Sequence, residues 1–150
     1  VKASEEATGT SALLKTGRVW FTEEKLQAIK DLPIWFVQSA DDPVVVPANY
    51  LLPTYQALVQ AGAENTWVSY FETVEGTDSP GTTYMGHFSW IYLFNNQVTG
   101  VQDKAAIAAS TDAEIFGFEP SNATGGGTAA ATVGETTYTN IFEWLNDQSK

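Results

Sequence analysis

Two kinds of side chain in this sequence could move a proton together: one imidazole and a pair of neighbouring carboxylates. His87 is the single histidine in the chain, and Asp41 and Asp42 stand 46 and 45 residues before it. An aspartate that accepts a hydrogen bond from one imidazole nitrogen holds the ring in one tautomer, so the other nitrogen can act as a general base. The pair could thus form the acid–base half of a nucleophilic triad. Alternatively, His87 is a structural histidine and Asp42 a turn former before Pro43.

The elements around these residues favour the first interpretation, because they predict a parallel βαβ unit. The apolar run Ile34–Val37 is typical of a strand that is buried on both faces of a parallel sheet. A helix with one apolar stripe is expected over residues 48–62, and a second strand over residues 65–74. Functional groups collect at the carboxyl ends of such strands. Since Asp42 follows the first strand and His87 follows the second, the two side chains are expected to meet.

Three further helices are expected. The first spans residues 22–32, with Thr22 as its N-cap and Pro33 as its stop. An apolar helix follows His87, in which Trp90 and Tyr92 are expected to pack rather than to bind sugar. An amphipathic helix over residues 138–147 has three apolar residues on one side: Ile141, Phe142 and Leu145.

Two segments of the chain show no clear periodicity. Residues 1–18 are polar and are predicted to be a loop or a processing region. Residues 101–137 are rich in alanine, glycine and threonine, and they predict an insertion or an irregular lobe. The 150 residues otherwise fit one α/β domain, or a large piece of one.

Composition narrows the classes of partner and of chemistry. The chain has 18 acidic and 7 basic residues, a formal net charge of −11, which disfavours nucleic acid and anionic membranes as partners. It has no cysteine, so disulfides, thiolate metal sites and cysteine nucleophiles are excluded. Asp41, Asp42 and Asp78 lack the spacing of a calcium loop.

The segment "LPIWFVQSADDPVVVP", followed by a helix, a strand and "GHFSW", resembles the C-terminal part of an α/β-hydrolase. The likeness is greatest to bacterial carboxylesterases of the feruloyl-esterase and prolyl-oligopeptidase-related type. It implies that Asp42 is the triad acid, with Asp41 as the fallback, and that His87 is the base. It also implies a carboxylic ester as substrate, with neither a cofactor nor a metal. Gln38 and Ser39 stand where the family often has histidine and glycine.

The nucleophile that such a triad needs is missing from the sequence. A nucleophile elbow requires G-x-S-x-G before the acid, and the nearest match, "GTSAL" around Ser11, has Leu13 for the second glycine. The resemblance therefore implies a C-terminal portion of a hydrolase, completed by an N-terminal segment that carries the serine. The alternative from a different class is a non-catalytic acidic α/β interaction module.

Overall fold

The fold is built on a pair of parallel strands, β1 (Ile34–Ser39) and β2 (Thr66–Phe71). We describe residues 22–77, 81–110 and 117–148 of a computed structural model. The strands pair without a bulge, from Ile34 beside Thr66 to Ser39 beside Phe71. Helix α3 (Leu51–Gln60) connects them after a short 3-10 turn, η1 (Pro47–Asn49). The predicted βαβ unit and the α/β class are therefore confirmed.

Helix α3 begins and ends where its sequence allows. Pro53 lies in the first turn, where its missing N–H has no helical acceptor to lose. At the other end Gly62 has a φ of +87°, and its N–H bonds the carbonyl of Val59 while the next N–H bonds the carbonyl of Leu58. This pair of bonds is a Schellman cap, which satisfies carbonyls that the helix end would leave open.

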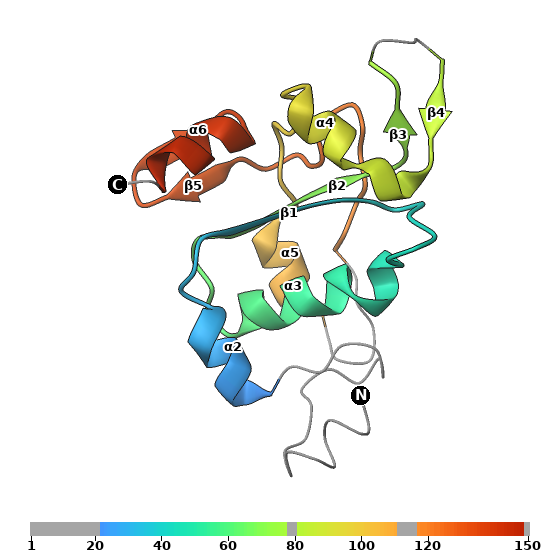
Figure 1. Cartoon of the computed structure of the whole chain (residues 1–150). Helices are drawn as coiled ribbons and strands as arrows, with labels where there is room; N and C mark the ends of the chain where they lie inside the picture. The colour runs from blue at the N-terminus through green and yellow to red at the C-terminus, as the bar shows by residue number, and fades with distance from the viewer. Residues whose placement is uncertain (1–21, 78–80, 111–116, 149–150) are drawn as a thin grey trace.

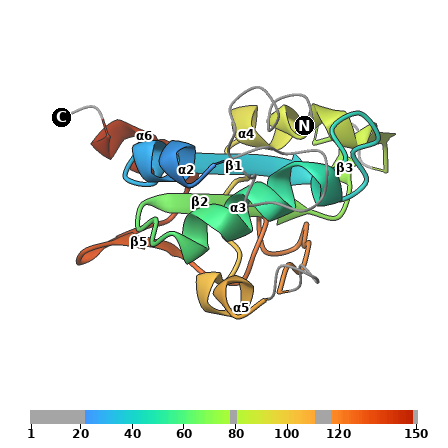
Figure 2. The same ribbon diagram turned by 90° about the horizontal axis from the view of Figure 1, so that it is seen from below.

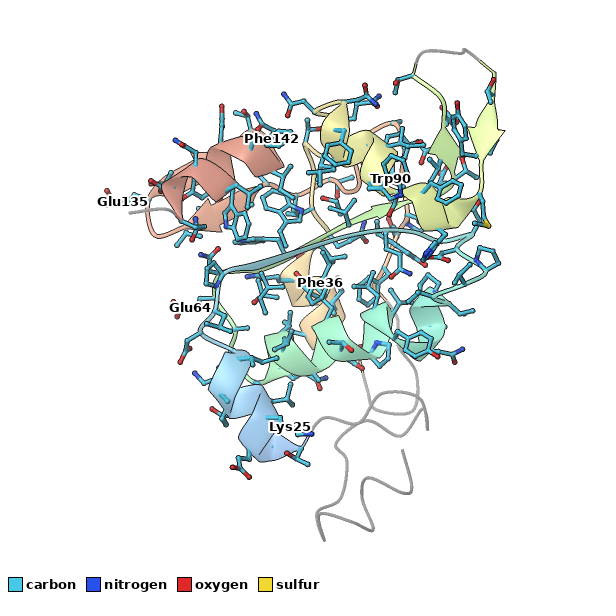
Figure 3. The ribbon with its side chains drawn as sticks, in the orientation of Figure 1. Lys25, Phe36, Glu64, Trp90, Glu135 and Phe142 are labelled. Atoms are coloured by element: carbon cyan, nitrogen blue, oxygen red, sulfur yellow. The ribbon has the colours of Figure 1, made fainter. Side chains whose placement is uncertain are left out.

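Helices cover both faces of the strand pair (Figure 1). On one face lie α2 (Glu23–Ile29), α3 and α5 (Lys104–Ala108), and on the other lie α4 (Trp90–Phe94) and α6 (Ile141–Asp147). Thr22 caps α2 as predicted, because its hydroxyl accepts the N–H of Lys25. The strand side chains alternate between the two layers, so Phe36 points toward α3 (Figure 3).

The two edges of the strand pair differ. Every residue of β2 is buried, whereas Ile34–Val37 of β1 are only partly buried. Main-chain bonds from Gln102 and Ser121 to the carbonyls of Val68 and Tyr70 close the outer edge of β2. Figure 2 shows β5 (Ala131–Val133) and α5 on the β2 side of the molecule, away from β1. Among the described residues no strand pairs with the outer edge of β1.

The segment over residues 101–137, predicted as an insertion or irregular lobe, packs against β2 where it is described. It contains α5 and a hairpin of β5 with β6 (Thr136–Tyr138), and its buried residues Val101, Ile107 and Ala131 belong to the core. Gly126 has a φ of +104°, and a Cβ there would lie 2.5 Å from the Cβ of Ser69. Only glycine therefore allows this close approach of the segment to β2. Residues 1–18, the predicted loop, lie outside the described residues.

The apolar face predicted for the last helix is wrong in part. Ile141 is buried as expected, but Phe142 and Leu145 are exposed and Trp144 is buried instead. Trp144 makes an edge-to-face contact with Trp35, at 5.5 Å between ring centroids, and its indole N–H donates to Asn65. These partners are distant in sequence, and they set which face of α6 turns inward.

The helix predicted after His87 is shorter than expected. It consists of the 3-10 turn η2 (Gly86–Phe88) and the five residues of α4, and it ends before Asn96, which has a φ of +53°. None of the helices in the described ranges is long and apolar enough to cross a bilayer.

Candidate active site

Asp42 lies in the turn that follows β1, and its carboxylate is held by four donors. Its Oδ1 accepts the N–H groups of Val44 and Val45 at 2.8 and 3.0 Å. Its Oδ2 accepts the side-chain amide of Gln38 at 3.2 Å and lies 3.2 Å from Nδ1 of His87. Asp42 is only 6% exposed, so this carboxylate is a buried group whose acceptor sites are filled.

The surroundings favour the ionised form of Asp42. Burial disfavours the charge and would raise the pKa, but the N–H groups of Val45 and Val44, then His87 and Gln38, stabilise the carboxylate. Their combined effect leaves the pKa of Asp42 below its ordinary value. Asp42 is therefore a carboxylate at neutral pH and an acceptor for the imidazole.

His87 reaches Asp42 through a hairpin and a tight turn. β3 (Val74–Glu75) and β4 (Thr83–Tyr84) pair antiparallel, and η2 follows and carries the histidine. A Cβ on Gly86 would lie 2.2 Å from the Asp41 carboxylate and 2.6 Å from the main-chain nitrogen of Asp42. The turn after β1 thus touches the main chain just before His87, and glycine is the residue that leaves room for it.

The ring of His87 has one buried side and one open side. Nδ1 faces the buried carboxylate, while the side chain is 40% exposed. In the described part of the chain no hydrogen bond to Nε2 is found. An Nδ1–H that donates to Asp42 leaves the lone pair on Nε2, and this tautomer can take a proton from an alcohol or water.

Asp41 and Asp42 differ in where their side chains lie. The carboxylate of Asp41 accepts the hydroxyl of Ser39, and only that of Asp42 is hydrogen-bonded to His87. Of the two aspartates that the sequence left open, the structure thus brings Asp42 to the histidine. Asp78 and Ser11 lie outside the described residues. Within the described ranges no group of three or more potential ligands is arranged to hold a metal ion.

The turn that leads from β2 to the hairpin is held by hydrogen bonds from two side chains, Tyr92 and Asn122. The buried Tyr92 stacks on Phe71, and its hydroxyl donates to the carbonyl of Thr73 and accepts the N–H of Glu75. Asn122 accepts the N–H of Thr73 and donates to the Thr73 hydroxyl and to the carboxylate of Glu75. These contacts fix the start of the hairpin that carries His87.

A row of aromatic side chains, of which Trp90 and Phe94 are exposed, extends from the histidine along α4. The rings of His87, Phe88, Trp90 and Phe94 follow one another at centroid distances of about 6 Å. Tyr92 packs in the core as predicted, whereas Trp90 is half exposed and contacts the rings of Phe88 and Phe94 (Figure 3). Phe94 is 74% exposed.

Sequence reasoning missed the roles of Gln38, Gly86 and Asn122. Gly86 could have been noticed, because glycine has no Cβ and so allows the close approach of another main-chain segment. Gln38 was visible only as a departure from a family pattern, and Asn122 lies in a segment without periodicity.

Comparison of the chain with protein-family models, with curated proteins and with solved structures found no match.

Proposed function

We propose that this chain supplies the acid and the base of a serine-dependent hydrolase of carboxylic esters. The observation that carries the proposal is the pairing of His87 Nδ1 with the buried Asp42 carboxylate, at 3.2 Å, beyond the carboxyl ends of two adjacent parallel strands. A pair so placed, with the second imidazole nitrogen open, is the arrangement that activates a hydroxyl nucleophile.

The reaction uses the two nitrogens of His87 in turn. Nε2 takes the proton of the serine hydroxyl as the serine oxygen bonds to the ester carbonyl carbon, and Asp42 stabilises the imidazolium that forms. The imidazolium then returns the proton to the departing alcohol as the carbon–oxygen bond breaks. A water molecule repeats the cycle on the acyl-serine, and this releases the acid and frees the serine. The substrate class rests on the resemblance of the sequence to esterases.

The serine would come from another segment, the N-terminal part of the hydrolase. Two features of the described chain support such a partner. The main-chain N–H groups of Trp35 and Val37 point away from β2, because the even-numbered residues of β1 are the ones that bond β2. The outward carbonyl of Val37 accepts the hydroxyl of Ser89. The exposed rings of Trp90 and Phe94 on α4 continue the aromatic row that begins at His87. Large exposed apolar surfaces often mark interfaces.

The decisive experiment is ester hydrolysis by the protein assembled with the segment that carries G-x-S-x-G. His87→Ala should reduce the turnover of a chromogenic short-chain ester by about 10³-fold or more. Thr137→Ala, an exposed change on the distant β5–β6 hairpin, is the matched control and should keep full turnover. Circular dichroism verifies that both variants are folded. Unchanged turnover in His87→Ala would refute the proposal.

A second candidate function is a non-catalytic interaction module of the α/β class. It is favoured by one observation: in the described ranges no serine or threonine hydroxyl is hydrogen-bonded to His87. Mass spectrometry of the purified protein separates the two functions. A co-purifying polypeptide with G-x-S-x-G supports the hydrolase, whereas a stable monomer of this chain alone supports the module.

A further inference from the structure

Among the described residues, Gln38 is the one side chain besides His87 that is hydrogen-bonded to Oδ2 of Asp42. It lies near the end of β1 and is buried. Its Nε2 donates to Oδ2 of Asp42 at 3.2 Å and also to the carbonyl of Val45. The same amide group thus joins the end of β1 to both sides of the turn that carries the acid.

Chemistry decides which end of the Gln38 amide faces this turn. Both neighbours, the carboxylate of Asp42 and the carbonyl of Val45, can only accept hydrogen bonds. If the amide were flipped, its oxygen would lie against two acceptors in a buried place, which is unfavourable. The NH₂ group therefore faces the turn, and both of its hydrogens are used.

We propose that Gln38 is a positioning residue, whose amide holds the Asp42 carboxylate so that Oδ2 is directed at His87. The main-chain N–H groups of Val44 and Val45 hold Oδ1. Without Gln38, Oδ2 would have His87 as its one donor and would keep a free acceptor site. With Gln38 in place, each oxygen has two donors, and rotation of the carboxylate would break bonds on both. The role in the reaction rests on the proposed function, but the positioning itself does not.

The wild-type chain tests the contact directly, without the serine segment. NMR spectroscopy can follow the carboxyl ¹³C of Asp42 and the side-chain amide of Gln38 through an acid titration. If the amide donates to the carboxylate, its proton and nitrogen signals should change with the same midpoint as the Asp42 carboxyl signal. Amide signals that stay constant while Asp42 titrates would overturn the proposal.

Two variants test whether the contact matters for the imidazole. Gln38→Met keeps a side chain of similar length but has no donor, so the pKa of Asp42 should rise. The fraction of His87 in the Nδ1–H form, measured from its ¹⁵N shifts where the ring is neutral, should fall. Gln38→Glu places a second carboxylate against Asp42, so the pair should retain a proton to a higher pH than the wild type.

Gln27→Glu is the matched control, because Gln27 also donates to a carboxylate, that of Glu23, but on the exposed surface of α2. It adds the same charge as Gln38→Glu and should change neither the Asp42 titration nor the His87 tautomer. A wild-type tautomer fraction in folded Gln38→Met would also overturn the proposal, since a residue that merely packs would leave the tautomer unchanged. Coupling of Gln38 to Asp42 without ester hydrolysis in the assembled protein would refute the hydrolase and leave the positioning role intact.

Discussion

At the scale of single residues, the site depends on one oxygen and one absent side chain. Oδ2 of Asp42 receives both His87 and Gln38, and the missing side chain of Gly86 lets the two loops touch. Both features are local, so single substitutions can test them.

Gly86→Ala should separate the two loops. Its Cβ would lie 2.6 Å from main-chain atoms of Asp41 and Asp42, which cannot move as a flexible side chain could. Overpacking of this kind costs about 1–3 kcal/mol in the free energy of unfolding. Urea denaturation measures this loss, and the His87 tautomer should change with it. Gly134→Ala is the control: it has a φ of +59° but open space around the added methyl group, so it should leave the tautomer unchanged.

Asp42 should make stability depend on pH in the acid range. Its pKa is lowered in the folded chain, so the unfolded chain binds a proton at a higher pH than the folded chain does. The stability that Asp42 contributes is therefore fully present above its ordinary pKa and is lost as the pH falls from that value through the lower folded value. Urea denaturation at a series of pH values measures this slope.

Asp42→Asn should flatten that acid dependence, and it should also lower stability at neutral pH, because an amide nitrogen would face the donor of Gln38. The exposed Asp31→Asn controls for the loss of one negative charge. A wild-type slope in Asp42→Asn would show that the acid sensitivity arises elsewhere.

At the scale of elements, β1 combines the sequence of an interior strand with the surroundings of an edge strand. Its run Ile34–Val37 predicts burial on both faces, and helices do cover both, but no strand pairs with its outer edge in the described structure. On that edge the carbonyl of Val37 accepts the hydroxyl of Ser89. The pattern of its main-chain bonds follows from the parallel register with β2.

Hydrogen exchange should reveal this pattern as alternating protection along β1. The amides of Phe36 and Gln38 bond β2 and should exchange slowly, whereas those of Trp35 and Val37 point outward and should exchange rapidly. The fully buried β2, paired on both sides, serves as the internal control. Equal protection at all four amides of β1 would mean that its outer edge is covered.

The sequence predicted the elements whose signals are local. The apolar run of β1, the stripe of α3 and the cap at Thr22 each lie within a few residues, and the order of strands and loops brought Asp42 and His87 together. The inward face of α6 depends on contacts of Trp144 with Trp35 and Asn65. Such partners leave no periodic signal in the helix itself.

The packing of residues 101–137 could not be predicted from the sequence, for a related reason. Main-chain atoms make its bonds to β2, as in the contact of Gln102 with Val68. Almost any residue can make such a bond, so the side-chain pattern carries little information about it. The glycines that permit the close approach of this segment to β2 indicated only a loop when the sequence was considered alone.

At the scale of the whole molecule, two opposing forces act on the isolated chain. The open edge of β1 and the exposed side chains of Trp90 and Phe94 favour association. The net charge of −11 opposes association between identical copies. Salt weakens only the electrostatic repulsion, because it shortens the Debye length from about 8 Å at physiological ionic strength to about 3 Å at 1 M.

The isolated chain should therefore self-associate more strongly as salt is raised, and sedimentation velocity at several protein concentrations measures this. Val37→Pro is the matched variant. It removes an outward N–H without breaking the ladder to β2, and it should reduce the association. Sedimentation that does not depend on salt, or that is the same in Val37→Pro, would mean that the β1 edge is not the contact.

Asn122 has a consequence for the way in which the protein is produced. Residues 122–124 read Asn-Ala-Thr, the acceptor sequence for N-linked glycosylation. A glycan would be attached to Nδ2, the atom that donates to Thr73 and Glu75 at the turn before the His87 hairpin. One of those two donor hydrogens would be lost to the sugar. Secretion from a glycosylating host would thus alter the support of the hairpin, whereas a host without this modification leaves the Asn122 contacts complete.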